Sequence, residues 1–268
     1  MTRDLEPPGA VSELLAELDP GRVISCVALA RVSDCEERPE EAARLNAGLA
    51  GEAARWCKEQ GARFVHVSTD LVFGSAEPRE GGFEESDEPA PLSEYGRSKL
   101  AGERAVLEAF SSGARSGEPS GGTVVRLPLL YGNSAGRGLG ASDSLLDVVA
   151  KDQRPPLFED EWRTPLEVSN AADALVELAY LDPEGGADGL LHLAGPDRVS
   201  RLELGIRVLE AAGLDPAQAR EEVRAVPSSS VPTVGARPRD VSLSAARACK
   251  LLETRLLGVA RGTERAMS

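Results

Sequence analysis

The sequence has few aromatic residues and few of the residues that usually bind metals. Phe, Trp and Tyr together make up 4% of the 268 residues. The only two histidines, His66 and His192, lie inside apolar stretches, where a packed side chain is the usual role. The four cysteines are Cys26, Cys35, Cys57 and Cys249, and none forms a CxxC pair. We therefore expect reduced, mostly buried thiols and no metal site.

The sequence also lacks long apolar runs and basic clusters. No stretch approaches the roughly 20 apolar residues of a membrane span, and the first residues do not resemble a secretory signal. The formal net charge is −14, with 44 acidic and 30 basic residues. Such an acidic chain repels phosphate backbones, so neither nucleic acid nor an anionic membrane is an expected partner. We expect a cytoplasmic protein, in which two or three local cations could still bind an anionic small molecule.

What the sequence does contain is an alternation of apolar strands and amphipathic helices. This alternation predicts crossover connections and an α/β fold with a doubly wound, mostly parallel, Rossmann-like sheet. The continuous apolar run 23–29 predicts a strand buried on both faces. The other expected strands are 63–67, 123–127 and 189–193, and the expected helices are 10–18, 39–61, 94–110, from about 142, 170–180, 201–212 and one after Ser244.

The pattern changes after Tyr131, where a glycine-rich loop and a proline-rich segment interrupt the alternation. We expect residues 1–132, with parts of 160–195, to form a dinucleotide-binding type of domain. Residues from about 133 to 268 are expected to form a smaller substrate-binding lobe interleaved with it.

The strongest chemical signal is the spacing of Tyr95 and Lys99. Positions i and i+4 share one helix face, so the phenol and the ammonium group can reach one cleft. A phenol with a pKa of about 10 is a poor acid at neutral pH, and a neighbouring cation lowers that pKa. Such a pair suits acid–base catalysis of a carbonyl–alcohol interconversion, although a solvated surface lysine is the simpler interpretation of the spacing alone.

The surrounding sequence favours the catalytic interpretation. Thr69 directly follows an expected strand, at the carboxyl edge where open α/β sheets bind ligands. Its hydroxyl can hold a substrate carbonyl beside the tyrosine. The acidic, proline-stiffened loop 85–91 separates the two motifs.

This order of motifs resembles that of an extended short-chain dehydrogenase/reductase. It is most similar to the dTDP-4-dehydrorhamnose reductase group, which also includes the regulatory beta subunit of methionine adenosyltransferase. The segments that carry the resemblance are Ser68-Thr69-Asp70, Tyr95 to Lys99, Asn46, Arg126 to Gly132, Arg163-Thr164-Pro165, Asp173-Ala174 and Arg237-Pro238-Arg239-Asp240.

The resemblance implies a role for each matching residue. Thr69, Tyr95 and Lys99 would form the catalytic triad, and Tyr95 and Lys99 would also bind the cofactor. The remaining implied cofactor contacts are Asp4 and Leu5 beside the adenine and Ala28 and Pro128 along the nicotinamide, and the implied substrate contacts are Phe73 and Arg163. The substrate would be a nucleotide-linked 4-keto sugar, the cofactor NADP or NAD, and a homo-oligomer is possible.

One departure from the family pattern limits these implications. The family begins with a strand, a glycine-rich turn and a helix that holds the cofactor pyrophosphate. Here that first strand–helix unit is missing, and the glycines at 132, 136, 138 and 140 lack the required spacing. We expect weak or absent cofactor binding by this chain. The sequence leaves two functions open, an NAD(P)H-dependent keto-sugar reductase and a non-catalytic regulatory relative that has lost dinucleotide binding.

Overall fold

A four-stranded parallel sheet forms the centre of the protein in the computed structural model. The structure describes residues 3–74, 80–111, 121–134, 140–181, 188–232 and 235–267. The strands are β1 (Arg22–Ser25), β2 (Arg63–Thr69), β3 (Gly122–Leu127) and β8 (Gly189–His192), in the order β1-β2-β3-β8. Every pair in this sheet is parallel, with Val65 opposite Thr123 and Thr123 opposite Gly189. The expected α/β fold with a mostly parallel sheet is confirmed.

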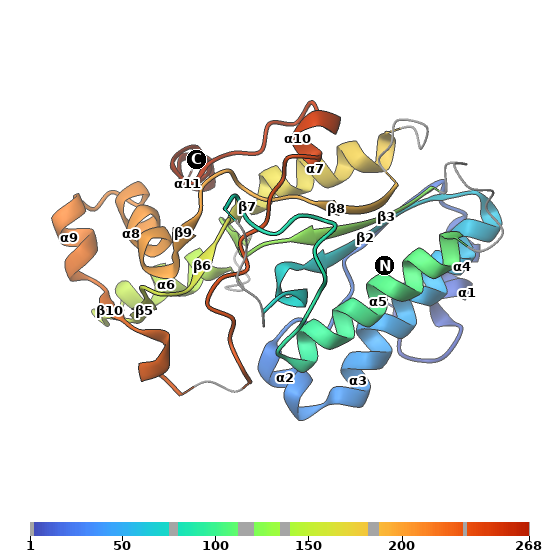
Figure 1. The fold of residues 1–268 in the computed structure, drawn as a ribbon, viewed down its shortest axis with the longest axis horizontal. Helices are drawn as coiled ribbons and strands as arrows, with labels where there is room; N and C mark the ends of the chain where they lie inside the picture. The colour runs from blue at the N-terminus through green and yellow to red at the C-terminus, as the bar shows by residue number, and fades with distance from the viewer. Residues whose placement is uncertain are drawn as a thin grey trace.

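Helices cover both faces of the sheet, as Figure 1 shows. The helices on one face are α1 (Ala10–Leu18), α4 (Leu49–Gln60) and α5 (Glu94–Ser111), and α7 (Val168–Tyr180) covers the other. Because neighbouring side chains of a strand point to opposite faces, Phe64 and Val124 pack toward α4 and α5. Val65 and Val125 pack toward α7 instead. The two hydrophobic layers therefore follow from the alternation within β2 and β3.

The first strand is shorter and more exposed than the apolar run 23–29 predicts. β1 ends at Ser25, and Val27 beyond it is 45% exposed. Within β1, Arg22 is exposed and the other residues are only partly buried. The prediction of a strand buried on both faces was wrong for these residues. The reason is position: among the described residues, β1 pairs with β2 alone and forms an edge of the sheet.

The long helix expected over 39–61 contains a widened turn. It consists of α3 (Pro39–Ala43), the π-helical segment η1 (Arg44–Gly48) and α4. Asn46, fully buried in η1, donates from Nδ2 to the Leu29 carbonyl and to Ser98 Oγ, and accepts at Oδ1 from the Leu29 amide. This one side chain ties the loop after β1 to α5. The short helix α2 (Val32–Glu37), which the sequence did not predict, precedes α3.

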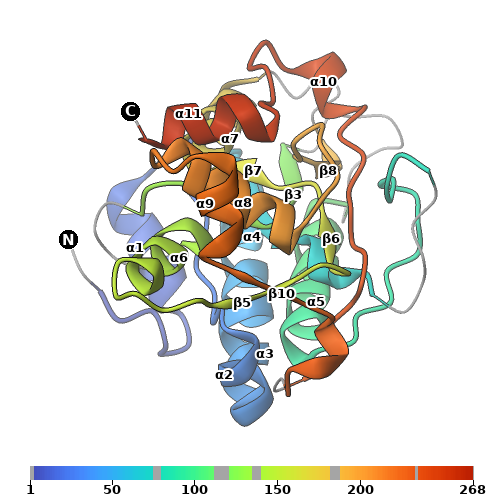
Figure 2. The ribbon, with the colours of Figure 1, turned by 90° about the vertical axis from the view of Figure 1, so that its left-hand side faces the viewer.

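A smaller group of elements lies beyond the carboxyl ends of the strands, and Figure 2 views it from that side. Its helices are α6 (Ala141–Val149), α8 (Arg201–Ala211), α9 (Pro216–Glu221) and α11 (Val259–Met267). Its short strand pairs are β4 (Leu130–Tyr131) with β7 (Leu166–Glu167), β5 (Pro156–Phe158) with β10 (Arg224–Val226), and β6 (Trp162–Arg163) with β9 (Val199–Ser200). The prediction of a single helix after Ser244 was wrong, because this segment forms two separate helices, α10 (Ala248–Leu251) and α11.

The histidines and cysteines divide between the interior and the surface. His66 and His192 are fully buried, as expected. Cys35 and Cys57 are buried and all four thiols are free, but Cys26 and Cys249 are exposed. The expectation of mostly buried thiols was therefore wrong for two of the four, because Cys26 follows the exposed edge strand.

Candidate active site

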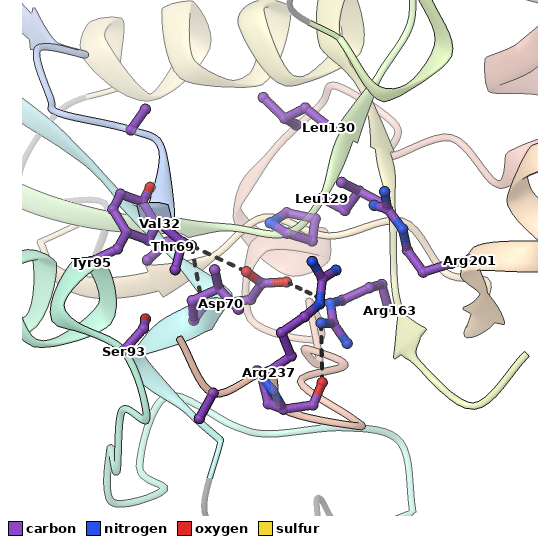
Figure 3. A pocket seen from close by; sticks show the side chains of 15 residues that line it. Val32, Thr69, Asp70, Ser93, Tyr95, Leu129, Leu130, Arg163, Arg201 and Arg237 are labelled. Atoms are coloured by element: carbon purple, nitrogen blue, oxygen red, sulfur yellow. Dashed lines mark hydrogen bonds and ion pairs between the residues drawn. The ribbon is translucent and has the colours of Figure 1, made fainter. Parts of the chain in front are cut away.

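A cavity of about 430 Å³ opens at the carboxyl ends of β2 and β3, where Thr69 and Pro128 lie. Figure 3 shows that side chains from separate parts of the chain line it. Its lining residues are Ala30, Val32, Thr69, Asp70, Leu71, Ser93, Tyr95, Pro128, Leu129, Leu130, Arg163, Arg201, Ala236, Arg237 and Pro238. The cavity thus brings two predicted catalytic residues together with Arg163, a predicted substrate contact.

Thr69 and Tyr95 meet at one wall of this cavity. Thr69 ends β2 and caps the short 3-10 helix η2 (Asp70–Val72), because its Oγ1 accepts a hydrogen bond from the Leu71 amide at 3.2 Å. The same hydroxyl donates to Asp70 Oδ1 at 3.1 Å and lies close enough to the Tyr95 phenol to stabilise its phenolate form by a hydrogen bond. Burial raises the pKa of Tyr95 to about 12, although the Thr69 hydrogen bond lowers it. The phenol is therefore protonated at neutral pH.

The position of Tyr95 depends on how the helix α5 begins. The Glu94 amide donates to Glu36 Oε1 of α2 at 2.9 Å, and the Gly96 amide donates to Ser93 Oγ at 3.1 Å. These contacts satisfy two of the amide donors that the first turn of a helix leaves unpaired. A carboxylate there also interacts favourably with the positive end of the helix dipole. The start of α5, and with it Tyr95, is thereby held beside the end of β2.

Lys99 does not line the cavity in this structure. It is 2% exposed, its Nζ donates to the Val67 carbonyl at 2.6 Å, and it lies 3.5 Å from His66 Nε2. Burial lowers the pKa of Lys99 to about 8, although Glu103, one helical turn further along α5, acts to raise it. Lys99 is not among the groups that shift the pKa of Tyr95, so their pairing stays a prediction.

A buried ion pair lies beneath the predicted triad. Arg126 of β3 donates from Nε and Nη2 to the two carboxylate oxygens of Glu103, at 2.9 and 2.6 Å, and both side chains are 2% exposed. Ser68 Oγ donates to Glu103 Oε1 at 2.5 Å. A bidentate pair with a further hydrogen bond can retain charge in the interior. It fixes α5 against β2 and β3 at the level of Lys99.

Three guanidinium groups make the other side of the cavity positive. Arg237 holds both oxygens of the buried Glu161, at 2.7 and 2.9 Å. Arg163 donates to the Trp162 and Pro238 carbonyls, and its Nε lies 3.9 Å from Asp70 Oδ2. Burial and the two neighbouring arginines lower the pKa of Arg201 to about 10. The arrangement suits an anionic ligand, because a few guanidinium groups that lie close together can bind an anion by charged hydrogen bonds.

Sequence reasoning missed three lining residues, Asp70, Arg201 and Arg237, although two lie within motifs quoted above. Asp70 belongs to the Ser68-Thr69-Asp70 triplet and Arg237 to the segment 237–240. Arg201 has only a weak signal, the capping box that Ser200 and Glu203 form at the start of α8. Membership of a motif indicates that a residue matters, but not that its side chain faces a ligand.

Other predicted contacts lie outside this cavity. Phe73 is 1% exposed and stacks on Phe83 with 4.1 Å between ring centroids. Asp4 is exposed and Leu5 packs against the hydrophobic layer under α1 and α4. Ala28 is half-buried. Two glycines of the loop considered for phosphate binding, 136 and 138, lie outside the described residues.

The described residues fit one end of a dinucleotide better than the other. Pro128, assigned to the nicotinamide, and Tyr95, assigned to catalysis and cofactor binding, both line the cavity. The helix that follows β1 is α2, whose N-cap is Arg31, and the sequence contains no Gly-x-Gly-x-x-Gly segment. A diphosphate cradle of the usual kind is therefore not found within the described ranges.

Metal sites and membrane spans are both absent from the described ranges. No cluster of three or more His, Cys, Asp or Glu side chains there is arranged to hold a metal ion. None of the described helices combines the length and the hydrophobicity that crossing a bilayer requires.

Comparisons with known proteins agree with the arrangement of the fold. Residues 2–264 match the model of the RmlD substrate binding domain. The dTDP-4-dehydrorhamnose reductase of Mycobacterium tuberculosis is 35% identical over 246 residues, which cover 90% of this chain and 73% of that protein. The rat methionine adenosyltransferase 2 subunit beta is 30% identical over 260 residues, covering 95% and 70% respectively.

The fold is shared with a solved structure. The dTDP-4-dehydrorhamnose reductase of Bacillus anthracis in complex with NADP superimposes with a TM-score of 0.82 at 23% identity, covering 98% of this chain and 85% of that one. The chain spans 66 to 73% of the length of the curated relatives it matches. With a family match over almost its whole length and relatives above 30% identity, this chain belongs to the RmlD substrate-binding-domain family, which includes the dTDP-4-dehydrorhamnose reductases.

Proposed function

We propose that this protein reduces the keto group of a nucleotide-linked sugar, of the dTDP-4-dehydrorhamnose kind, with NADPH or NADH as reductant. The observation that carries the proposal is the joint placement of two hydroxyl donors and three arginines around one cavity. Thr69 and Tyr95 suit a carbonyl that becomes an alcohol, and the arginines suit an anionic group. The relationship to the M. tuberculosis reductase supports this choice of reaction.

Tyr95 is proposed as the acid of this reaction. Its pKa of about 12 keeps the phenol protonated until negative charge develops on the substrate oxygen. An alkoxide is a stronger base than the phenolate, so proton transfer from Tyr95 is favourable once the carbonyl carbon has received hydride. Thr69 is proposed to orient the carbonyl oxygen. Lys99 is proposed to complete the triad by turning from the Val67 carbonyl toward Tyr95 and the cofactor ribose.

The arginine side of the cavity is proposed to bind the substrate diphosphate. Arg163 and Arg237 already donate to carbonyl or carboxylate oxygens. The guanidinium group of Arg201 lines the cavity and forms no hydrogen bond to another described residue. Guanidinium groups bind phosphate oxygens in a bidentate manner. Arg201 is therefore the cation most available to a substrate anion.

The cofactor would supply the hydride, and a few residues of this chain would hold its nicotinamide end. Ala28 and Pro128 are proposed to lie along the nicotinamide, and Asp4 and Leu5 near the adenine. Residues from about 133 to 268 are proposed to form the substrate lobe over residues 1–132, with Arg163 and the buried Phe73 shaping the substrate side.

The test is NADPH oxidation by the purified protein with dTDP-4-dehydrorhamnose, comparing the wild-type chain with Tyr95→Phe. The substitution keeps the ring and removes the acid, so turnover at saturating NADPH is expected to fall about a hundredfold or more. The NADPH dissociation constant is expected to change little. Equal turnover by both proteins would show that Tyr95 is not the proton donor.

A second function is favoured by one observation, the lack of a diphosphate cradle among the described residues. A relative that keeps the fold without turnover would then act as a regulatory subunit, as the similarity to methionine adenosyltransferase 2 subunit beta suggests. Keto-sugar-dependent NADPH oxidation that is lost in Tyr95→Phe would exclude this alternative. Complete absence of oxidation at saturating NADPH would favour it.

A further inference from the structure

One carboxyl group in the cavity has no assigned role. Asp70 is 4% exposed, and its Oδ2 atom has no hydrogen-bond partner among the described residues although it is inaccessible to solvent. The nearest cation is Arg163, whose Nε lies 3.9 Å from Oδ2, too far for a hydrogen bond. A buried carboxylate normally has its oxygens satisfied, so this one requires an explanation. Its other oxygen, Oδ1, faces Thr69.

The hydrogen bonds of Thr69 restrict what the hydroxyl can do. A hydroxyl has one proton to donate and two lone pairs to accept with. In this structure the proton goes to Asp70 Oδ1, and one lone pair accepts from the Leu71 amide. With Asp70 ionised, Thr69 has no proton to direct at Tyr95 or at a substrate. The hydrogen bond from Thr69 to Asp70 therefore opposes a role of Thr69 as a donor to the substrate carbonyl or to Tyr95.

A neutral Asp70 reverses the hydrogen bond between Asp70 and Thr69. Its hydroxyl then donates to Thr69 Oγ1, the Thr69 hydroxyl donates to Tyr95 Oη or to the substrate, and the Tyr95 proton is free for the carbonyl oxygen. Figure 3 shows Asp70 between these hydroxyls and the arginines. We propose that Asp70 is a positioning residue that, as a neutral acid, directs the Thr69 and Tyr95 protons toward the substrate and then reprotonates Tyr95. The proposal rests on the reductase function proposed above.

The proton balance of one turnover closes along this chain. The Tyr95 Oη–H bond breaks as a new O–H bond forms on the substrate oxygen, whose carbon has received hydride from the cofactor. The Thr69 proton then passes to Tyr95, and the Asp70 carboxyl proton passes to Thr69. Asp70 is left as a carboxylate, which regains one proton from solvent.

The charged groups that face Asp70 and the burial of its carboxyl group together determine its pKa. Arg163 of β6 and Arg201 of α8 favour the carboxylate, as do the hydrogen bonds from Thr69 and the Leu71 amide. Glu161 lies behind Arg163 at 3.8 Å and reduces the effect of that cation, and Tyr95 of α5 is neutral. Burial opposes ionisation more strongly, so the pKa of Asp70 rises from 3.8 to about 6. Both forms are therefore accessible near neutral pH.

The pH profile of reduction tests this role in Asp70→Asn. The amide donates permanently to Thr69 but has no proton to lose. Wild-type turnover, at saturating cofactor and substrate, is expected to fall as the pH rises through about 6, and Asp70→Asn is expected to lack this fall. Asp152→Asn is the matched control, because Asp152 is exposed in a turn with φ 54 that asparagine tolerates. An unchanged fall in Asp70→Asn would overturn the proposal.

A measurement without cofactor separates this proposal from the reductase function. Carbon-13 NMR of labelled aspartate carboxyls follows the Asp70 titration, and Asp70→Asn identifies its signal. We expect titration near pH 6, and a shift to higher pH in Thr69→Val, which removes the stabilising hydrogen bond. Titration near 3.8, or none of the expected shift in Thr69→Val, would overturn the proposal. A wild-type chain without keto-sugar turnover would instead overturn the reductase function, while this titration still tests the hydrogen-bond chain.

Discussion

The backbone of Gly96 packs directly against the carbonyl oxygen of Leu71. A Cβ atom built on Gly96 would lie 2.3 Å from that oxygen and 2.8 Å from Pro91 Cβ. This close approach brings the first turn of α5 against η2, where Thr69 and Asp70 lie. The distance between Tyr95 and Thr69 therefore depends on the absence of one methyl group.

Gly96→Ala is expected to destabilise the protein and to weaken the Thr69–Tyr95 pair. The clash is with backbone, so α5 must move, at a cost of about 1–3 kcal/mol in the free energy of unfolding. Gly48→Ala is the matched control, since its Cβ would meet nothing within 4 Å and its backbone is helical. It is expected to stabilise the protein by about 0.5–1 kcal/mol. Urea unfolding of both variants checks this, and equal effects would contradict it.

Arg201→Met is expected to weaken binding of dTDP. A hydrogen bond to a charged group contributes about 1.5–3 kcal/mol, so the dissociation constant should rise tenfold or more. Arg239→Met is the control, because that side chain is 70% exposed and does not line the cavity. Calorimetric titration of both variants with dTDP distinguishes them. The same loss in both would indicate a general effect of charge.

The two buried histidines are expected to destabilise the protein in acid. Burial lowers the pKa of His192 to about 3 and holds that of His66 well below 6.5. Each depressed pKa contributes stability that is present above 6.5 and lost as the pH falls toward the folded-state value. Asp70, with its raised pKa, has the opposite effect, as its contribution is lost when the pH rises from 3.8 through about 6.

His192→Asn isolates one of these contributions. The asparagine amide can take over the donation of His192 Nδ1 to the Phe83 carbonyl, at 3.2 Å in the wild-type protein, and does not titrate. The urea midpoint of this variant is expected to fall less steeply between pH 6.5 and 4 than that of the wild type. An unchanged slope would show that His192 is not protonated on unfolding.

The 268-residue chain is expected to bind NADPH weakly, with a dissociation constant above about 0.1 mM. The reason is that the nicotinamide-side residues are present but no diphosphate cradle is found among the described residues. Isothermal titration calorimetry measures the affinity directly. A low-micromolar constant would mean that the phosphates bind elsewhere, and the glycine loop from 132 to 140 would be the first segment to substitute.

The sequence alone was sufficient to predict those helices and strands that a local pattern of apolar residues specifies. The apolar runs of β2 and β3 and the amphipathic period of α1 and α5 predicted their positions to within two residues. The motif order predicted one site for Thr69, at the carboxyl end of a strand, and Tyr95, at the start of the next long helix, and both line the cavity. The prediction that β1 is buried on both faces was wrong, because an apolar run does not show how many neighbouring strands a strand has.

Only the tertiary structure decided the electrostatics of the site. The i, i+4 spacing places Tyr95 and Lys99 on one helix face, but the Val67 carbonyl and His66 determine where the lysine points. Burial in the folded protein raises the pKa of Asp70 to about 6, and Arg201 lines the cavity because α8 begins beside β6. Sequence fixes which groups are near one another along the chain. Burial and long-range contacts, which arise only when distant segments pack, determine their charge and direction.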